Sequence, residues 1–191
     1  RLCPAPCEKS CVLGIIKEPV AIENIEKSIV ERGFAEGWIK PQTPATRTGK
    51  TVAVVGSGPA GLAAAQQLNR AGHTVTVFER DNAIGGLLRY GIPNFKLEKG
   101  IIDRRVAILE AEGIVFKTNV NVGVNFSVEE LKAFDSIVLC GGATERRGLP
   151  TKGADSKGVV QAMDFLTQQT KVLYGEKIEN QVKATGKNVI V

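Results

Sequence analysis

The stretch TVAVVGSGPAGLAAA, residues 51–65, decides the fold. Its first five residues predict a buried strand, and the alanine- and leucine-rich segment at its end predicts a helix. Between them Gly56, Gly58 and Gly61 have the spacing G-x-G-x-x-G, and TVTVFE at 74–79 predicts a second strand. This order predicts a βαβ unit, so the expected fold class is α/β and Rossmann-like, with a parallel sheet and helices on both faces.

The glycine turn also predicts a pyrophosphate site. Gly56 permits the tight turn, Gly58 leaves no side chain where a pyrophosphate approaches, and Gly61 lets the helix pack closely on the strand. Pro59 falls in the first helical turn, where its missing N–H costs nothing. The free N–H groups and the positive end of the helix dipole then face the phosphates. The residues expected to hold them are Gly56, Ser57, Gly58, Pro59, Ala60 and Gly61.

Glu79 ends the second strand, where an acid hydrogen-bonds the ribose of the adenosine half. Its charge repels a 2′-phosphate, so we expect FAD or NAD rather than NADP. Two further glycine pairs, at 85–86 and 141–142, expose backbone near the first turn and favour the longer FAD. NAD remains open, and so does the alternative that the glycines form an ordinary turn beside a surface acid.

The rest of the chain predicts a loop at 1–18, an amphipathic helix at 21–38 and a linker at 40–50. Beyond the βαβ unit we expect the following further elements: helices at 98–113, 127–134 and 161–174, and strands at 114–118, 135–140 and 186–191. The only methionine is Met163, so we expect the chain to be a piece of a longer protein.

Composition excludes several classes of function. The net charge of +5 is spread without a block of like charges, which argues against a nucleic-acid partner. The apolar runs are shorter than the ~20 residues that a membrane span needs. Three of the four cysteines, Cys3, Cys7 and Cys11, crowd into eleven residues, which favours metal ligation in a reducing compartment, and we expect a cytoplasmic protein. Zinc is possible, but His73 has no metal spacing to the cysteines.

Five segments carry a resemblance to a known family: RLCPAPCEKSCVLGI, AIENIEKSIVERGFAEGW, VAVVGSGPAGLAAA, VFERDNAIGGLLRYGIPNFKLEKGIIDRR and VLCGGATERR. They resemble the small (beta) subunit of NADPH-dependent glutamate synthase over essentially the whole chain. The resemblance implies a subunit that passes electrons from NADPH through FAD and 4Fe–4S clusters to a large subunit, which makes glutamate from glutamine and 2-oxoglutarate. Dihydropyrimidine dehydrogenase and the flavin subunit of ferredoxin:NADP oxidoreductase are similar in the same regions, and a non-catalytic flavin-binding module is the third reading.

The resemblance also implies domains and site residues. Residues 1–40 would be a partial helical iron–sulfur domain, 41–50 a linker, 51–186 the FAD-binding domain, and 187–191 the first strand of an NADPH-binding domain whose site is absent here. Cys3 and Cys7 would ligate one cluster, Cys11 the other, and Glu26 would be a non-cysteine ligand unless it is a solvated surface acid. The further FAD contacts expected are Leu2, Gly86, Leu87, Lys96, Val122 and Gly142. No catalytic acid, base or nucleophile is expected.

Overall fold

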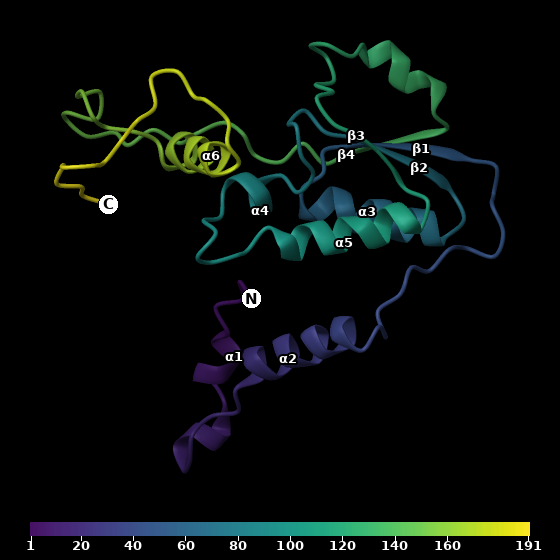
Figure 1. Cartoon of the computed structure of the whole chain (residues 1–191), viewed down its shortest axis with the longest axis horizontal. Coiled ribbons are helices and arrows are strands. Elements are labelled where there is room, and N and C mark those ends of the chain that lie inside the picture. Colours follow the sequence, from purple (N-terminus) through teal and green to yellow (C-terminus); the bar gives the residue numbers. More distant parts are fainter.

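The computed structural model describes all residues, 1–191. Figure 1 shows a sheet with helices beneath it, an N-terminal segment below those helices, and a C-terminal segment to one side. In chain order the elements are α1 (Pro6–Lys9), the 3₁₀ helix η1 (Val12–Ile15), α2 (Ile22–Ala35), β1 (Thr51–Val55), α3 (Pro59–Arg70), β2 (Thr74–Phe78), α4 (Leu87–Tyr90), α5 (Gly100–Ala111), β3 (Val115–Lys117), the 3₁₀ helix η2 (Val128–Ala133), β4 (Ser136–Leu139) and α6 (Ala162–Leu173).

The sheet confirms the predicted Rossmann-like architecture. Its four strands lie in the order β3-β2-β1-β4, and every pair is parallel. The strand β1, the helix α3 and the strand β2 form the expected βαβ unit. Because β1 pairs with β4, the turns that follow these two strands lie at the same edge of the sheet, and the Cys140 N–H donates to the Val55 carbonyl at 2.8 Å.

Alternate strand residues face opposite sides of the sheet, and the two sides are covered differently. The helices α3 and α5 cover one face, whose buried residues are Val52, Val54, Ala65, Val75, Val77, Leu109 and Ile114. On the other face Phe78 packs against the rings of Phe126 and Phe134, with centroid distances of 4.9 and 5.7 Å.

The second face also carries a helix, as expected, but it is a short 3₁₀ helix whose Leu131 packs in the same core as Phe78. The second face is covered by residues 118–134, whose single helical segment is η2 (Figure 1). A capping box at Ser127 starts that helix, but Phe134 is already extended (φ −91°, ψ 146°) because the chain must enter β4 two residues later. The segment is too short to form an α-helix of useful length.

The linker at 41–50 forms no helix or strand, as predicted, yet it is firmly attached to the sheet domain. The fully buried Glu112 carboxylate accepts a hydrogen bond from the Gln42 N–H at 3.1 Å. The same carboxylate contacts Gln66 Nε2 at 3.0 Å and Arg70 Nη2 at 2.7 Å. Farther along the linker, Arg47 donates to the Asn69 side chain at 2.7 Å. These side chains fix the path by which the N-terminal segment reaches β1.

Replacing Glu112 tests this attachment. Burial raises the pKa of the Glu112 carboxyl, but the hydrogen bonds from Arg70 and Gln66 lower it more, so the folded-state pKa lies below its usual value. The carboxylate therefore stabilises the fold above the unfolded pKa of about 4.3, and this contribution is lost as the pH falls through the lower folded value. At pH 7, Glu112→Gln is expected to reduce the free energy of unfolding by about 1.5–3 kcal/mol.

Denaturant titrations at several pH values measure this effect. The difference between wild type and Glu112→Gln should shrink below about pH 4.3. Glu110→Gln, at an exposed position of the same helix, is the matched control and should leave the stability unchanged. Equal stability of Glu112→Gln and wild type at pH 7 would show that the linker is not held by this carboxylate.

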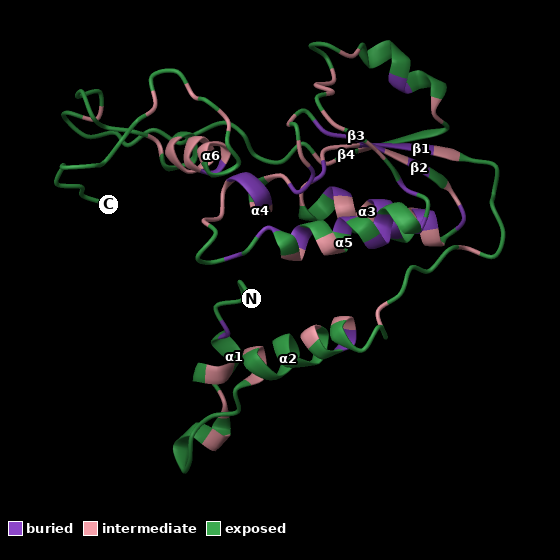
Figure 2. Cartoon of the chain, viewed as in Figure 1, coloured by how far each residue is buried: buried purple, intermediate pink, exposed green.

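Two terminal expectations have different outcomes. The helix expected at 161–174 forms as α6, and its Thr170 side chain contacts the Tyr90 carbonyl of α4 at 3.5 Å. The strand expected at 186–191 is wrong. Residues 187–191 are fully exposed and lie far from the sheet (Figures 1 and 2), so their backbone groups have no neighbouring strand to pair with.

None of the helices combines the length and the apolar character that crossing a membrane requires.

Candidate dinucleotide site

The first and third glycines of the turn are required by the packing of the protein itself. Gly56 has φ +102°, a conformation that favours glycine, and a Cβ there would lie 2.4 Å from the Cys140 carbonyl oxygen. A Cβ on Gly61 would lie 1.9 Å from the Gly56 carbonyl oxygen. These two residues let α3 and β4 approach the end of β1, so they serve the fold as well as any ligand.

Gly58 has no such role. Its backbone (φ −65°, ψ −179°) is one that any residue adopts, and a Cβ there would meet no protein atom within 4 Å. The space in front of it is open. Because α3 begins at Pro59, its first N–H groups have no partner within the helix and lie beside this space. The turn therefore fits a phosphate group that approaches the backbone at Gly58.

The second glycine pair packs directly on the first turn. Gly85 and Gly86 have φ values of +129° and +52°, and a Cβ on Gly86 would lie 2.9 Å from the Cα of Gly58. The Gly85 N–H donates to the Ser57 hydroxyl at 3.0 Å. Leu87, which begins α4 at this point, is exposed. The structure thus brings Gly58, Gly86 and Leu87 together, as a ligand that contacts all three requires.

Glu79 lies at the end of β2 beside the turn, and its carboxylate faces inward. The residue is 5% exposed, and one carboxylate oxygen accepts hydrogen bonds from the Ser57 N–H, at 3.0 Å, and from the Ser57 hydroxyl. The other oxygen accepts from the Asp81 N–H at 2.9 Å. Sequence reasoning placed Ser57 at the pyrophosphate only and did not foresee that it also orients the acid.

Asp81 adds a second acid to this edge of the sheet. Burial, together with the nearby charge of Glu79, raises the pKa of the Asp81 carboxyl. Two cations offset its charge, since Arg80 Nε and Lys171 Nζ each lie 3.9 Å from the Asp81 carboxylate. The acid that disfavours a 2′-phosphate at this edge is therefore Glu79.

Two buried cations, which sequence reasoning missed, shape the loop between the second glycine pair and α5. Arg89 donates through Nε to the Ile84 carbonyl at 2.5 Å and pairs with Asp103 at 2.5 Å. Lys99 donates to the Leu97 and Ile92 carbonyls, and burial lowers the pKa of its ammonium group. Arginine and lysine are usually surface residues, so only the nearby backbone carbonyls, which a sequence does not show, reveal their role.

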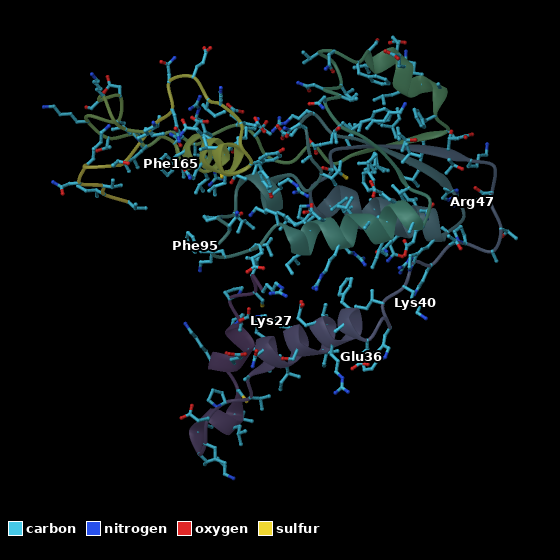
Figure 3. All side chains as sticks on the ribbon, in the orientation of Figure 1. Lys27, Glu36, Lys40, Arg47, Phe95 and Phe165 are labelled. Carbon is cyan, nitrogen blue, oxygen red and sulfur yellow. The ribbon has the colours of Figure 1, made fainter.

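The remaining predicted FAD contacts lie in different parts of the structure. Gly142 has φ +71° and open space around its Cα. Val122 packs beside Phe78 in the core that covers the second face of the sheet. Lys96 is exposed in the loop next to Phe95, which Figure 3 labels. Leu2 lies in the N-terminal segment below α5, apart from the glycine turns (Figure 1).

The predicted metal ligands do not form a metal site in this chain. Cys3 and Cys7 are exposed, Cys11 is half-buried, and no three His, Cys, Asp or Glu side chains are arranged to hold a metal ion. Backbone hydrogen bonds, the largest from Val20, lower the pKa of the Cys11 thiol. Glu26 is exposed on α2. The four residues do not fit a cluster by themselves, so their role as ligands stays a prediction.

Comparison with known proteins agrees with the fold and the turn. The model of a family described as an NAD(P)-binding Rossmann-like domain matches residues 54–111. Among solved structures, Mycobacterium tuberculosis FprA in complex with NADPH is similar, with a TM-score of 0.56 and 29% identity, covering 62% of this chain and 28% of that one. The match supports a dinucleotide-binding oxidoreductase fold.

Two curated relatives match along the whole chain. The glutamate synthase (NADPH) small chain of Mycobacterium tuberculosis is 56% identical over 197 residues, which cover 100% of this chain and 40% of the relative. That of Bacillus subtilis is also 56% identical, over 100% of this chain and 39% of the relative. This chain therefore spans about two fifths of the length of these two relatives.

Proposed function

We propose that this chain, a homologue over its whole length of one section of the glutamate synthase small chain, is the FAD-binding part of an electron-transfer oxidoreductase. The observation that carries the proposal is the open space at Gly58. The fold does not need glycine there, whereas a pyrophosphate does. The two glycine turns, packed on one another, extend this site along the edge of the sheet.

Each part of the cofactor has residues of this chain to hold it. The turn from Gly56 to Gly61 binds the pyrophosphate, and Glu79 accepts hydrogen bonds from the ribose hydroxyls of the adenosine. Gly86 and Leu87 line the flavin side. The further contacts proposed from the resemblance are Leu2, Lys96, Val122 and Gly142. When bound, FAD supplies the chemistry of accepting a hydride and releasing single electrons, and the protein supplies binding, orientation and electrostatics.

The names of the relatives support a role for the complete protein. We propose that it takes reducing equivalents from NADPH and passes them to a large subunit that makes glutamate from glutamine and 2-oxoglutarate, within the cytoplasm. NADPH is not assigned to the turn described here because Glu79, at the end of β2, disfavours its 2′-phosphate. The iron–sulfur clusters predicted with Cys3, Cys7, Cys11 and Glu26 carry no step of this proposal, since these residues alone do not form a site.

The experiment that tests the function uses the complete protein that contains this chain. Purified protein should show a flavin absorption spectrum, and NADPH should reduce an artificial electron acceptor through it. Absence of flavin from a folded, reconstituted preparation would contradict the proposal. Bound flavin with reduction by NADH alone would correct only the choice of nicotinamide.

Removing the Glu79 carboxylate is expected to weaken FAD binding. A hydrogen bond to a charged group contributes about 1.5–3 kcal/mol, and each ~1.4 kcal/mol is tenfold in affinity. Glu79→Ala should therefore raise the dissociation constant of FAD by about 10- to 100-fold, measured by titration of the apo protein. Glu98→Ala, at an exposed position, is the control. An unchanged dissociation constant in Glu79→Ala would remove Glu79 from the site.

A further inference from the structure

The helix α2 lies alongside α5 but is almost entirely exposed (Figures 1 and 2). Its apolar residues Ile25 and Ile29 are 49% and 63% exposed, and only Gly33 is buried. Both isoleucines belong to the apolar spacing that predicted the helix, yet neither packs in a core of this chain. Because they do not, apolar burial does not fix the position of α2 on the sheet domain, and another contact has to do so.

That contact is a bidentate ion pair between Arg104 and Glu31. The guanidinium of Arg104, on α5, donates from Nη1 and Nη2 to the two carboxylate oxygens of Glu31, on α2, at 2.8 and 2.6 Å. A pair with this geometry constrains orientation as well as distance. The Arg104 guanidinium also lies over the ring of Phe34, one turn farther along α2, at 4.0 Å from its centroid. One arginine of the sheet domain thus contacts two residues on the same face of α2.

The electrostatics of the pair agree with its geometry. The hydrogen bond from Arg104 is the main reason that the pKa of Glu31 falls to about 2. Reciprocally, Glu31 raises the pKa of Arg104.

Glu31 also connects α2 to the cysteine-bearing segment. The Arg1 guanidinium contacts the same Glu31 carboxylate, and Arg1 lies two residues before Cys3. Farther along this segment, Glu8 accepts a hydrogen bond from the Glu23 N–H of α2 at 2.9 Å. The segment that carries the cysteines therefore moves with α2, and the position of α2 depends on Arg104.

We propose that Arg104 is a positioning residue, which fixes the cysteine-bearing N-terminal segment relative to the dinucleotide site. The linker alone does not fix the position of α2. The hydrogen bond from Gln42 to Glu112 holds the linker beyond the end of α2, so it does not constrain the orientation of the helix. The proposal rests on the proposed function in one respect: a fixed distance between the cysteine-bearing segment and the dinucleotide site matters only if electrons pass between them. The contact itself exists with or without the cofactor.

The test compares Glu31→Gln, Arg104→Met and the double variant with wild type. Amide hydrogen exchange in α2 should become about 2- to 5-fold faster in each single variant, the range that a partly exposed ion pair gives. Exchange in β1 and β2 should stay unchanged. Trp38, the only tryptophan, follows α2 and is exposed, so its fluorescence anisotropy reports the motion of the segment independently. Glu36→Gln is the matched control, because Glu36 (Figure 3) pairs only with Arg32 of its own helix.

The outcomes separate the possibilities. The double variant should be looser than wild type by less than the sum of the two single effects, because both substitutions remove the same ion pair, while Arg104 keeps Phe34 and Glu31 keeps Arg1 in the respective single variants. Additive effects of Glu31→Gln and Arg104→Met, or α2 protection equal to wild type in both, would overturn the proposal. FAD titration of the same variants should give the wild-type affinity. If wild type itself fails to bind FAD, the proposed function fails, whereas the exchange data still decide the role of Arg104.

Discussion

Gly58→Val is expected to yield a folded protein that no longer binds FAD. The backbone at Gly58 is one that any residue adopts, and an added Cβ meets no protein atom within 4 Å, so the free energy of unfolding should change little. The added side chain fills the space that the pyrophosphate must enter. We expect the loss of affinity to exceed about 1,000-fold, or ~4 kcal/mol, because a steric overlap excludes the ligand instead of removing one hydrogen bond.

Titration with FAD measures the affinity of Gly58→Val, and denaturant unfolding of the same preparation measures its stability. Gly148→Val is the matched control, since a Cβ at Gly148 also meets nothing within 4 Å and the residue lies in an exposed loop. It should leave both properties unchanged. If flavin copurifies with Gly58→Val at full stoichiometry, the open space at this glycine is not the pyrophosphate site.

Gly61→Val is expected to have the opposite effect, on the fold itself. A Cβ at this position would lie 1.9 Å from the Gly56 carbonyl oxygen and 3.5 Å from the Cys140 side chain. The nearer atom belongs to the backbone, so α3 must move away from β1 to relieve the overlap. We expect the free energy of unfolding to fall by about 3 kcal/mol or more, the upper end of what overpacking costs.

A loss of that size is a large part of the stability of an ordinary domain, about 5–15 kcal/mol. Chemical denaturation should therefore show a clear decrease in the midpoint for Gly61→Val, and none for Gly58→Val. FAD binding should weaken in both variants, in Gly61→Val because the turn is displaced. Equal stability of the two variants would contradict the division of roles among the three glycines.

The local features of the fold were predictable from the sequence because they depend on neighbouring residues. The run TVAVV, the glycine turn and the helix behind it follow from apolar periodicity and from the backbone needs of glycine within 51–72. Glu79 was placed correctly at the end of β2 for the same reason. Its site geometry was not predictable, since the bonds to Ser57 join residues far apart in the sequence.

Most of what the sequence did not reveal depends on contacts between residues that lie far apart in the chain. Arg104 lies within α5 and Glu112 directly after its last residue, and their roles depend on Glu31 and Gln42, which lie in another part of the chain. The apolar spacing of α2 correctly predicted a helix, but the sequence did not show that a side-chain ion pair attaches this helix to α5. The strand expected at 186–191 failed because a strand exists only where a partner strand offers hydrogen bonds.

Equilibrium titration of the apo protein with FAD, NAD⁺ and NADP⁺ tests the central claim most directly. The geometry at Gly58, Gly86 and Glu79 predicts saturable binding of FAD at one site, weaker binding of NAD⁺ and the weakest binding of NADP⁺, with FAD binding abolished in Gly58→Val. Binding of NADP⁺ in preference to FAD, or FAD binding that Gly58→Val leaves intact, would contradict the account.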